Sequence, residues 1–135
     1  MIPGAVFFDT DFHFHDGQDG EKLFVVLGSN DGITVVSKTT SKQNGRGTTF
    51  GCQQADRFQN FYLPKGSCHL RTCTWICLDE FYEFNATQLL QKRFSGTVNH
   101  ICDLPHEMIS SLQECAVESL DISSFQEGII RASMA

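Results

Sequence analysis

Three consecutive segments with the residue pattern of β-strands, separated by turn-forming residues, constrain the fold of this chain more than any other feature. Apolar and polar residues alternate over 8–15, a period of two that is typical of a half-buried strand. Residues 22–28 are nearly all apolar and suit a central strand, and the β-branched run 33–40 predicts a third. Short turns rich in Asp and Gly separate these segments, so we expect an antiparallel order.

The remainder of the chain adds strands and two helices. Residues 41–51 are polar and rich in glycine, which predicts a long loop, and strand character resumes over 58–63 and 69–78. Asn85 followed by Gln88 is a capping-box pattern, which predicts a short helix that ends at Gly96. Residues 97–101 predict one more strand.

A second helix is expected near the C-terminus, with Asp103 as its cap and Pro105 in its first turn. Its apolar stripe has helical spacing and is expected to pack on the sheet. The members of this stripe are Met108, Ile109, Leu112, Cys115, Ala116 and Leu120.

These elements predict a single domain over 1–135 of the α+β class. The expected architecture is a small twisted antiparallel β-barrel over about 3–120, with one short inserted helix and a C-terminal helix. The tail, 121–135, has no strong periodicity and is left without an assigned structure. No stretch approaches the ~20 apolar residues that span a bilayer, so we expect no membrane partner.

The six cysteines are expected to be thiols. A chain of 135 residues closes a core without disulfides, and its N-terminus lacks the pattern of a signal peptide, so a cytoplasmic location is expected. A zinc site is not expected from Cys73 and Cys77, because positions four apart on a strand lie about 13 Å apart.

The charge is unevenly distributed. The formal net charge is −6, yet 38–71 holds six basic residues and one acidic residue, a local net charge of +5. This segment predicts a face that holds an anionic ligand, and a solvated loop is the alternative interpretation.

Four short motifs in order along the chain resemble the PemK/MazF family. They are Phe-Phe-Asp-Thr-Asp-Phe (7–12), Asp-Gly-Gln-Asp-Gly-Glu-Lys (16–22), Phe-Val-Val-Leu-Gly (24–28) and Val-Val-Ser-Lys-Thr-Thr-Ser-Lys (35–42). Members of this prokaryotic family are small Src-homology-3-like barrels that serve as toxins of toxin–antitoxin modules. The resemblance implies an endoribonuclease that cleaves single-stranded RNA without metal or cofactor. It also implies a cognate antitoxin and a homodimer.

The resemblance also assigns roles to particular residues. Thr40 and Ser41 match the family's threonine-serine pair, whose hydroxyl lies beside the scissile phosphate. The family's Arg-Pro pair, which opens the second strand and holds the phosphate, is replaced here by Glu21 and Lys22. Lys22 supplies a point charge without the planar fork of a guanidinium.

Metal-free cleavage of RNA requires a base, an acid and a group that stabilises the charge on phosphorus. His13 and His15 titrate in the right range and are the expected base and acid. Lys38, Lys42 and Arg46, which flank Thr40 in the sequence, are expected to bind the RNA and stabilise that charge. We therefore expect a groove between the first hairpin and the loop 41–51.

Three alternatives stay open at this point. In the first, His13 and His15 are solvated residues that pair with Asp9 and Asp11. In the second, the chain is a non-catalytic module that binds a protein partner or RNA. In the third, the face formed by these four residues holds a divalent ion in a metal-dependent enzyme.

Most aromatic residues, Trp75 included, are expected in the core. Phe50 and Phe58, near the basic loop, are the expected exceptions and are candidates for stacking on bases.

Overall fold

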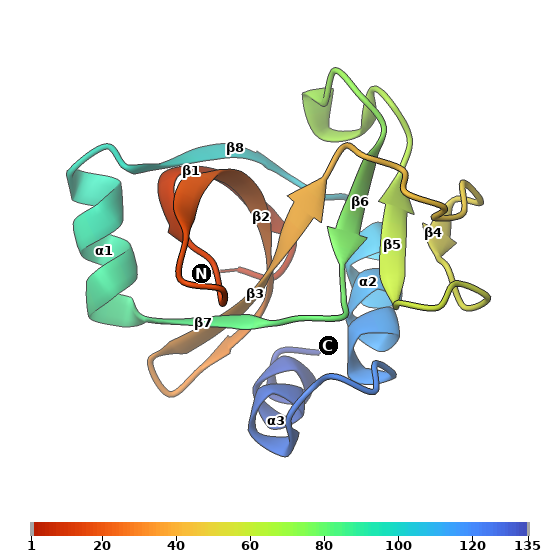
Figure 1. Cartoon of the computed structure of the whole chain (residues 1–135). Helices are drawn as coiled ribbons and strands as arrows, with labels where there is room; N and C mark the ends of the chain where they lie inside the picture. Colours follow the sequence, from red (N-terminus) through yellow and green to blue (C-terminus); the bar gives the residue numbers. More distant parts are fainter. Residues whose placement is uncertain (1, 135) are drawn as a thin grey trace.

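The computed structural model describes residues 2–134 and has the expected α+β class, with an antiparallel sheet of eight strands and three α-helices (Figure 1). The strands are β1 (Ala5–His13), β2 (Asp19–Asn30), β3 (Ile33–Thr40), β4 (Gly51–Cys52), β5 (Asn60–Leu63), β6 (Thr74–Cys77), β7 (Tyr82–Asn85) and β8 (Val98–Asp103). The helices are α1 (Ala86–Phe94), α2 (His106–Val117) and α3 (Ser124–Ala132), and a short 3₁₀ turn, η1, covers Ser67–His69.

The strand order is β4-β5-β6-β3-β2-β1-β8, with β7 paired to β3 off this path. Strand β3 therefore contributes to both halves of the sheet. One of its edges pairs with β2, and its other edge is shared between β7 at 33–36 and β6 at 39–40. Within residues 2–134 the end strands β4 and β8 do not pair with each other, so the sheet is open and is not closed into a barrel.

A β-bulge in β1 changes the faces that the alternating sequence pattern predicts. The register with β2 passes from Asp9 opposite Lys22 to Phe12 opposite Gly20, which places one extra residue on β1. As a result Phe12 shares a core cluster with Phe7 and not with Phe8. Asp9, expected on a polar outer face, is 0% exposed.

Two apolar clusters stabilise the sheet. The larger lies beneath helices α2 and α3, and its members include Val25, Leu27, Val35, Leu112 and Ile130. The smaller includes Leu89 of α1, with Phe7, Phe12, Phe24 and Val36. Helix α3 approaches β2 so closely at Gly28 that a Cβ there would lie 2.9 Å from the Cα atom of Ile130. Only glycine fits this contact without a shift of α3.

The helix boundaries confirm one predicted cap and correct another. Asn85 and Gln88 form the expected capping box of α1. Helix α2 begins after Pro105, and the expected cap, Asp103, is instead the last residue of β8. This helix ends at Val117, so Leu120 lies beyond it and is fully exposed instead of packing on the sheet.

The tail, which had no assigned structure, contains α3. Its N-terminus has a capping box in which Ser123 accepts a hydrogen bond from the backbone of Gln126 and the Gln126 side chain accepts one from the backbone of Ser123. Ile129 and Ile130 on this helix are buried in the larger cluster.

Four of the six cysteines form disulfides, so the prediction of six thiols is wrong for these four. Cys52 of β4 is bonded to Cys115 of α2, and Cys68 of η1 is bonded to Cys102 of β8, with Cα–Cα distances of 5.8 and 5.9 Å. Cys73 and Cys77 are thiols.

Disulfides persist in oxidising compartments, and this weighs against the expected cytoplasmic location, which stays a prediction. None of the helices within residues 2–134 is long and apolar enough to cross a membrane.

Candidate functional site

A cavity of about 310 Å³ lies where β2 and the end of β3 meet the segment between η1 and β6. We refer to it as the Thr40 cavity. Its polar lining residues are Glu21, Lys22, Thr39, Thr40, Ser41, Arg71, Thr72 and Thr74. Two cationic side chains and a row of hydroxyl groups thus line one hollow, and this combination suits a phosphate group.

Strand register places the first part of this cavity. Phe24 of β2 lies opposite Lys38 of β3 at the end of their paired register, and Lys22 and Thr40 lie two residues beyond this pair on their own strands. Directly opposed residues in a sheet point to the same face. Lys22, Lys38 and Thr40 therefore share one face of the sheet at the end of β3.

The loop that follows β3 is held by hydrogen bonds near the cavity. The backbone N–H of Lys42 donates to Thr40 Oγ1 over 3.2 Å. Further along, Gly47 accepts from Trp75 Nε1–H over 2.8 Å, and its own N–H donates to Asp56 Oδ2 over 2.9 Å. These bonds fix the start and the middle of the loop against β3 and β6.

Lys22 has an environment that lowers its pKa. Partial burial is the main cause, and the positive charges of Lys38 and Lys42 act in the same direction. These cations, which the sequence predicted as RNA-binding residues, thus lie near enough to Lys22 to affect its proton affinity. A lysine with a lowered pKa gives up its proton more readily than an ordinary surface lysine.

Lys38 is engaged elsewhere and does not line the Thr40 cavity. Its ammonium group forms an ion pair with Glu80 and lies 5.4 Å from the centre of the Phe14 ring. Burial acts to lower the pKa of Lys38, but the hydrogen bond and charge of Glu80 outweigh it and raise the pKa. Lys38 therefore stays protonated and contributes positive charge that Glu80 offsets.

Arg46 lies at a second, smaller hollow of about 100 Å³, which Arg57 and Phe58 also line. Its guanidinium donates to the backbone C=O of Lys42 over 3.1 Å. The Arg57 guanidinium lies 5.1 Å from the centre of the Phe58 ring. Neither Lys42 nor Arg46 lines the Thr40 cavity.

Trp75, Phe50 and Phe58 have the predicted locations, the first in the core and the other two on the surface. Trp75 is buried, whereas Phe50 and Phe58 are exposed by 56% and 51%. The two phenylalanines are thus accessible for stacking on a base.

His15 lies beyond the end of β1 and is not at the Thr40 cavity. Its ring stacks on Tyr82 with a centroid distance of 3.9 Å, and its Nε2 lies 2.8 Å from the backbone oxygen of Phe81. This contact requires Nε2 to carry the proton and donate it, which leaves Nε2 without a free lone pair.

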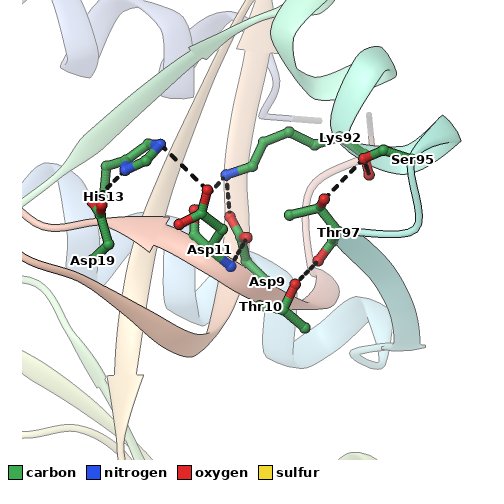
Figure 2. A network of polar contacts seen from close by, with 8 residues as sticks. All are labelled: Asp9, Thr10, Asp11, His13, Asp19, Lys92, Ser95 and Thr97. Carbon is green, nitrogen blue, oxygen red and sulfur yellow. Dashed lines mark hydrogen bonds and ion pairs between the residues drawn. The ribbon is translucent and has the colours of Figure 1, made fainter.

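His13 belongs to a network of polar contacts on β1, β2, α1 and the segment between α1 and β8 (Figure 2). Its Nδ1 contacts Asp19 Oδ1, and its Nε2 lies 3.9 Å from Asp11 Oδ2. The hydrogen bond to Asp19 is the main cause of a raised pKa of His13. His13 and Asp11 line a cavity of about 380 Å³ that does not include Thr40.

The structure therefore brings together only part of the predicted site. Lys22, Thr40 and Ser41 meet in one cavity, whereas His13 and His15 lie at other places on the surface. Arg71 completes the cavity, and sequence analysis had counted it only among the basic residues of 38–71.

Comparison with protein-family models gives no match to this chain, and comparison with curated proteins gives none either.

Proposed function

We propose that this chain binds single-stranded RNA in the Thr40 cavity and cleaves it without a metal ion. The observation that carries the proposal is the meeting of Thr40 and Ser41 with two cationic side chains, Lys22 and Arg71, in one cavity. Hydroxyl donors beside an ammonium and a guanidinium match the needs of a phosphodiester, which presents negatively charged acceptor oxygens.

Arg71 supplies the group that the PemK/MazF resemblance expects on the second strand, where this chain has Glu21 and Lys22. A guanidinium binds two phosphate oxygens with a planar fork, which a lysine cannot do. Arg71 comes from the segment before β6 and is exposed, so its head group is free to meet a ligand.

The cavity also holds candidates for proton transfer. Glu21 would accept the proton of the ribose 2′-hydroxyl, whose oxygen attacks phosphorus and displaces the 5′-oxygen of the next nucleotide. Lys22, with its lowered pKa, would protonate that leaving oxygen. The products are a 2′,3′-cyclic phosphate and a 5′-hydroxyl, and Arg71 would stabilise the extra charge on phosphorus in the transition state.

The finer fold and the biological setting belong to the same proposal. An antiparallel sheet whose halves share β3 supports an open variant of the Src-homology-3-like fold of PemK/MazF type. On this proposal the chain is the toxin of a prokaryotic toxin–antitoxin module, forms a homodimer and is held inactive by a cognate antitoxin.

One observation favours a second candidate, a non-catalytic module that binds RNA at the same cavity. Among the side chains that the structure describes, those that line the Thr40 cavity include no histidine, the side chain most often used as general base. Cleavage and binding are therefore tested together.

The test incubates end-labelled single-stranded RNA with the protein in EDTA, and compares wild type with Lys22→Met, Thr40→Ala and Arg71→Met. Arg131→Met is the matched control, because Arg131 lies on α3 and pairs with Glu127. We expect cleavage by wild type and Arg131→Met and loss of cleavage in the other three. A shift in RNA mobility without cleavage supports the binding module. Wild type that neither binds nor cleaves RNA, or an Arg71→Met variant equal to wild type, overturns both candidates.

A further inference from the structure

Three potential metal ligands lie close together beside the turn of the β1–β2 hairpin (Figure 2). Asp11, His13 and Asp19 each offer one ligand atom, and the three atoms all lie within 4.8 Å of one another. Two ligands of one zinc ion lie about 3 to 3.5 Å apart, because each metal–ligand bond is about 2.1 Å long. Small side-chain rotations therefore bring the three atoms around one ion.

The β1–β2 pairing and the bulge in β1 set this arrangement. Asp11 and His13 are two positions apart on β1, and His13 lies directly opposite Asp19 on β2. The bulge before Phe12 places Asp11 where its carboxylate approaches the imidazole ring. All three residues thus belong to paired strands, which position side chains more firmly than a loop does.

A buried ion pair fixes the backbone of Asp11 from both sides. The N–H of Asp11 donates to Asp9 Oδ1 over 2.8 Å, and its C=O accepts from Lys92 Nζ over 3.0 Å. Lys92 Nζ also lies 2.6 Å from Asp9 Oδ2, where Asp9 is 0% exposed. Supporting contacts of this kind hold ligands in place at metal sites.

We propose that Asp11, His13 and Asp19 bind a divalent transition-metal ion, with zinc as the best fit. An imidazole nitrogen with two carboxylates is a typical zinc ligand set, and it favours zinc over magnesium, which takes oxygen ligands alone. The adjoining cavity of about 380 Å³ leaves room for water or a ligand at the open coordination positions. The positive charge of Lys92 is already neutralised by Asp9.

This site does not depend on the RNA proposal. Neither Asp11 nor His13 lines the Thr40 cavity, so metal-free RNA cleavage there and zinc binding here succeed or fail separately.

The test is a titration of the full chain with zinc chloride, followed by amide NMR signals. His13→Gln and Asp19→Asn remove ligands that are more than half exposed, so the fold survives both changes. His100→Gln is the matched control, since His100 lies 3.0 Å from Asp103 in another exposed pair, which belongs to no group of three potential ligands within residues 2–134. Magnesium chloride is the second probe.

We expect zinc to shift the amide signals of Asp11, His13 and Asp19 in wild type and in His100→Gln. His13→Gln and Asp19→Asn should each weaken zinc binding at least about tenfold. The proposal is overturned if zinc leaves these signals in place, or if His13→Gln binds zinc as well as wild type does. It is also overturned if magnesium shifts the same signals equally in wild type and His13→Gln, because the site is then a carboxylate patch without histidine.

Discussion

Replacing Lys92 with Met is expected to destabilise the fold, because it removes the cationic partner of a buried carboxylate. Asp9 is 0% exposed, and Lys92, with a side chain that is 17% exposed, is its cationic partner at 2.6 Å. Removal of one partner from a buried pair leaves an uncompensated charge, which costs about 3–5 kcal/mol. The free energy of unfolding, measured with urea and far-UV circular dichroism, should fall by that amount in Lys92→Met.

Two further variants separate this effect from loss of packing. Asn at position 9 has no charge but still accepts the N–H of Asp11, so Asp9→Asn with Lys92→Met should be more stable than Lys92→Met alone. Arg131→Met breaks an exposed pair with Glu127 and should cost less than about 1 kcal/mol. The reasoning fails if Lys92→Met costs as little as Arg131→Met, or if the double variant regains nothing.

Three more predictions follow from the disulfides, the cavity and the tail. The double variant Cys52→Ser, Cys115→Ser removes a disulfide between residues 63 positions apart, and its free energy of unfolding in urea titrations should fall by about 4 kcal/mol. Equal stability of reduced and oxidised wild type would contradict this. Cleavage needs the protonated form of Lys22, so the cleavage rate should fall as the pH rises through the pKa of Lys22, which lies below the ordinary lysine value. A cleavage rate that stays constant up to the ordinary lysine pKa would refute the role of Lys22 as the general acid. Ser123→Ala removes the cap of α3 and should cost about 1 kcal/mol in thermal unfolding, whereas an unchanged melting temperature would show that packing alone holds this helix.

Local patterns in the sequence predict much of the fold. The turns and β-branched runs place β2 and β3, and Asn85 with Gln88 marks the start of α1. The start of α3 has the same pattern in Ser123 and Gln126, so the capping box was a usable signal for a helix in the tail.

Long-range features could not be derived from those patterns. The bulge in β1 depends on pairing with β2, and it places Asp9 in the interior although strict alternation predicts an outer face. The disulfide partners Cys52 and Cys115 lie on β4 and α2, and the spacing of the cysteines does not specify which of them pair.

The candidate site shows the same limit. Thr40 and Ser41 could be selected from a local motif, and the register of β2 and β3 then brings Lys22 to them. Arg71 could not be selected from a local motif, because it reaches the cavity through the pairing of β6 with β3, and these strands are more than thirty residues apart in the sequence. The histidines were selected for their chemistry, but their positions depend on Asp19 and Tyr82, which lie on other strands.

The salt dependence of RNA binding tests the Thr40 cavity most directly. Each phosphate contact with single-stranded RNA contributes about 0.7 to the slope of log K against log salt concentration. We expect Arg71→Met to lower this slope by about 0.7 relative to wild type and Arg131→Met to leave it unchanged. An Arg71→Met variant with the wild-type slope would contradict a phosphodiester in this cavity.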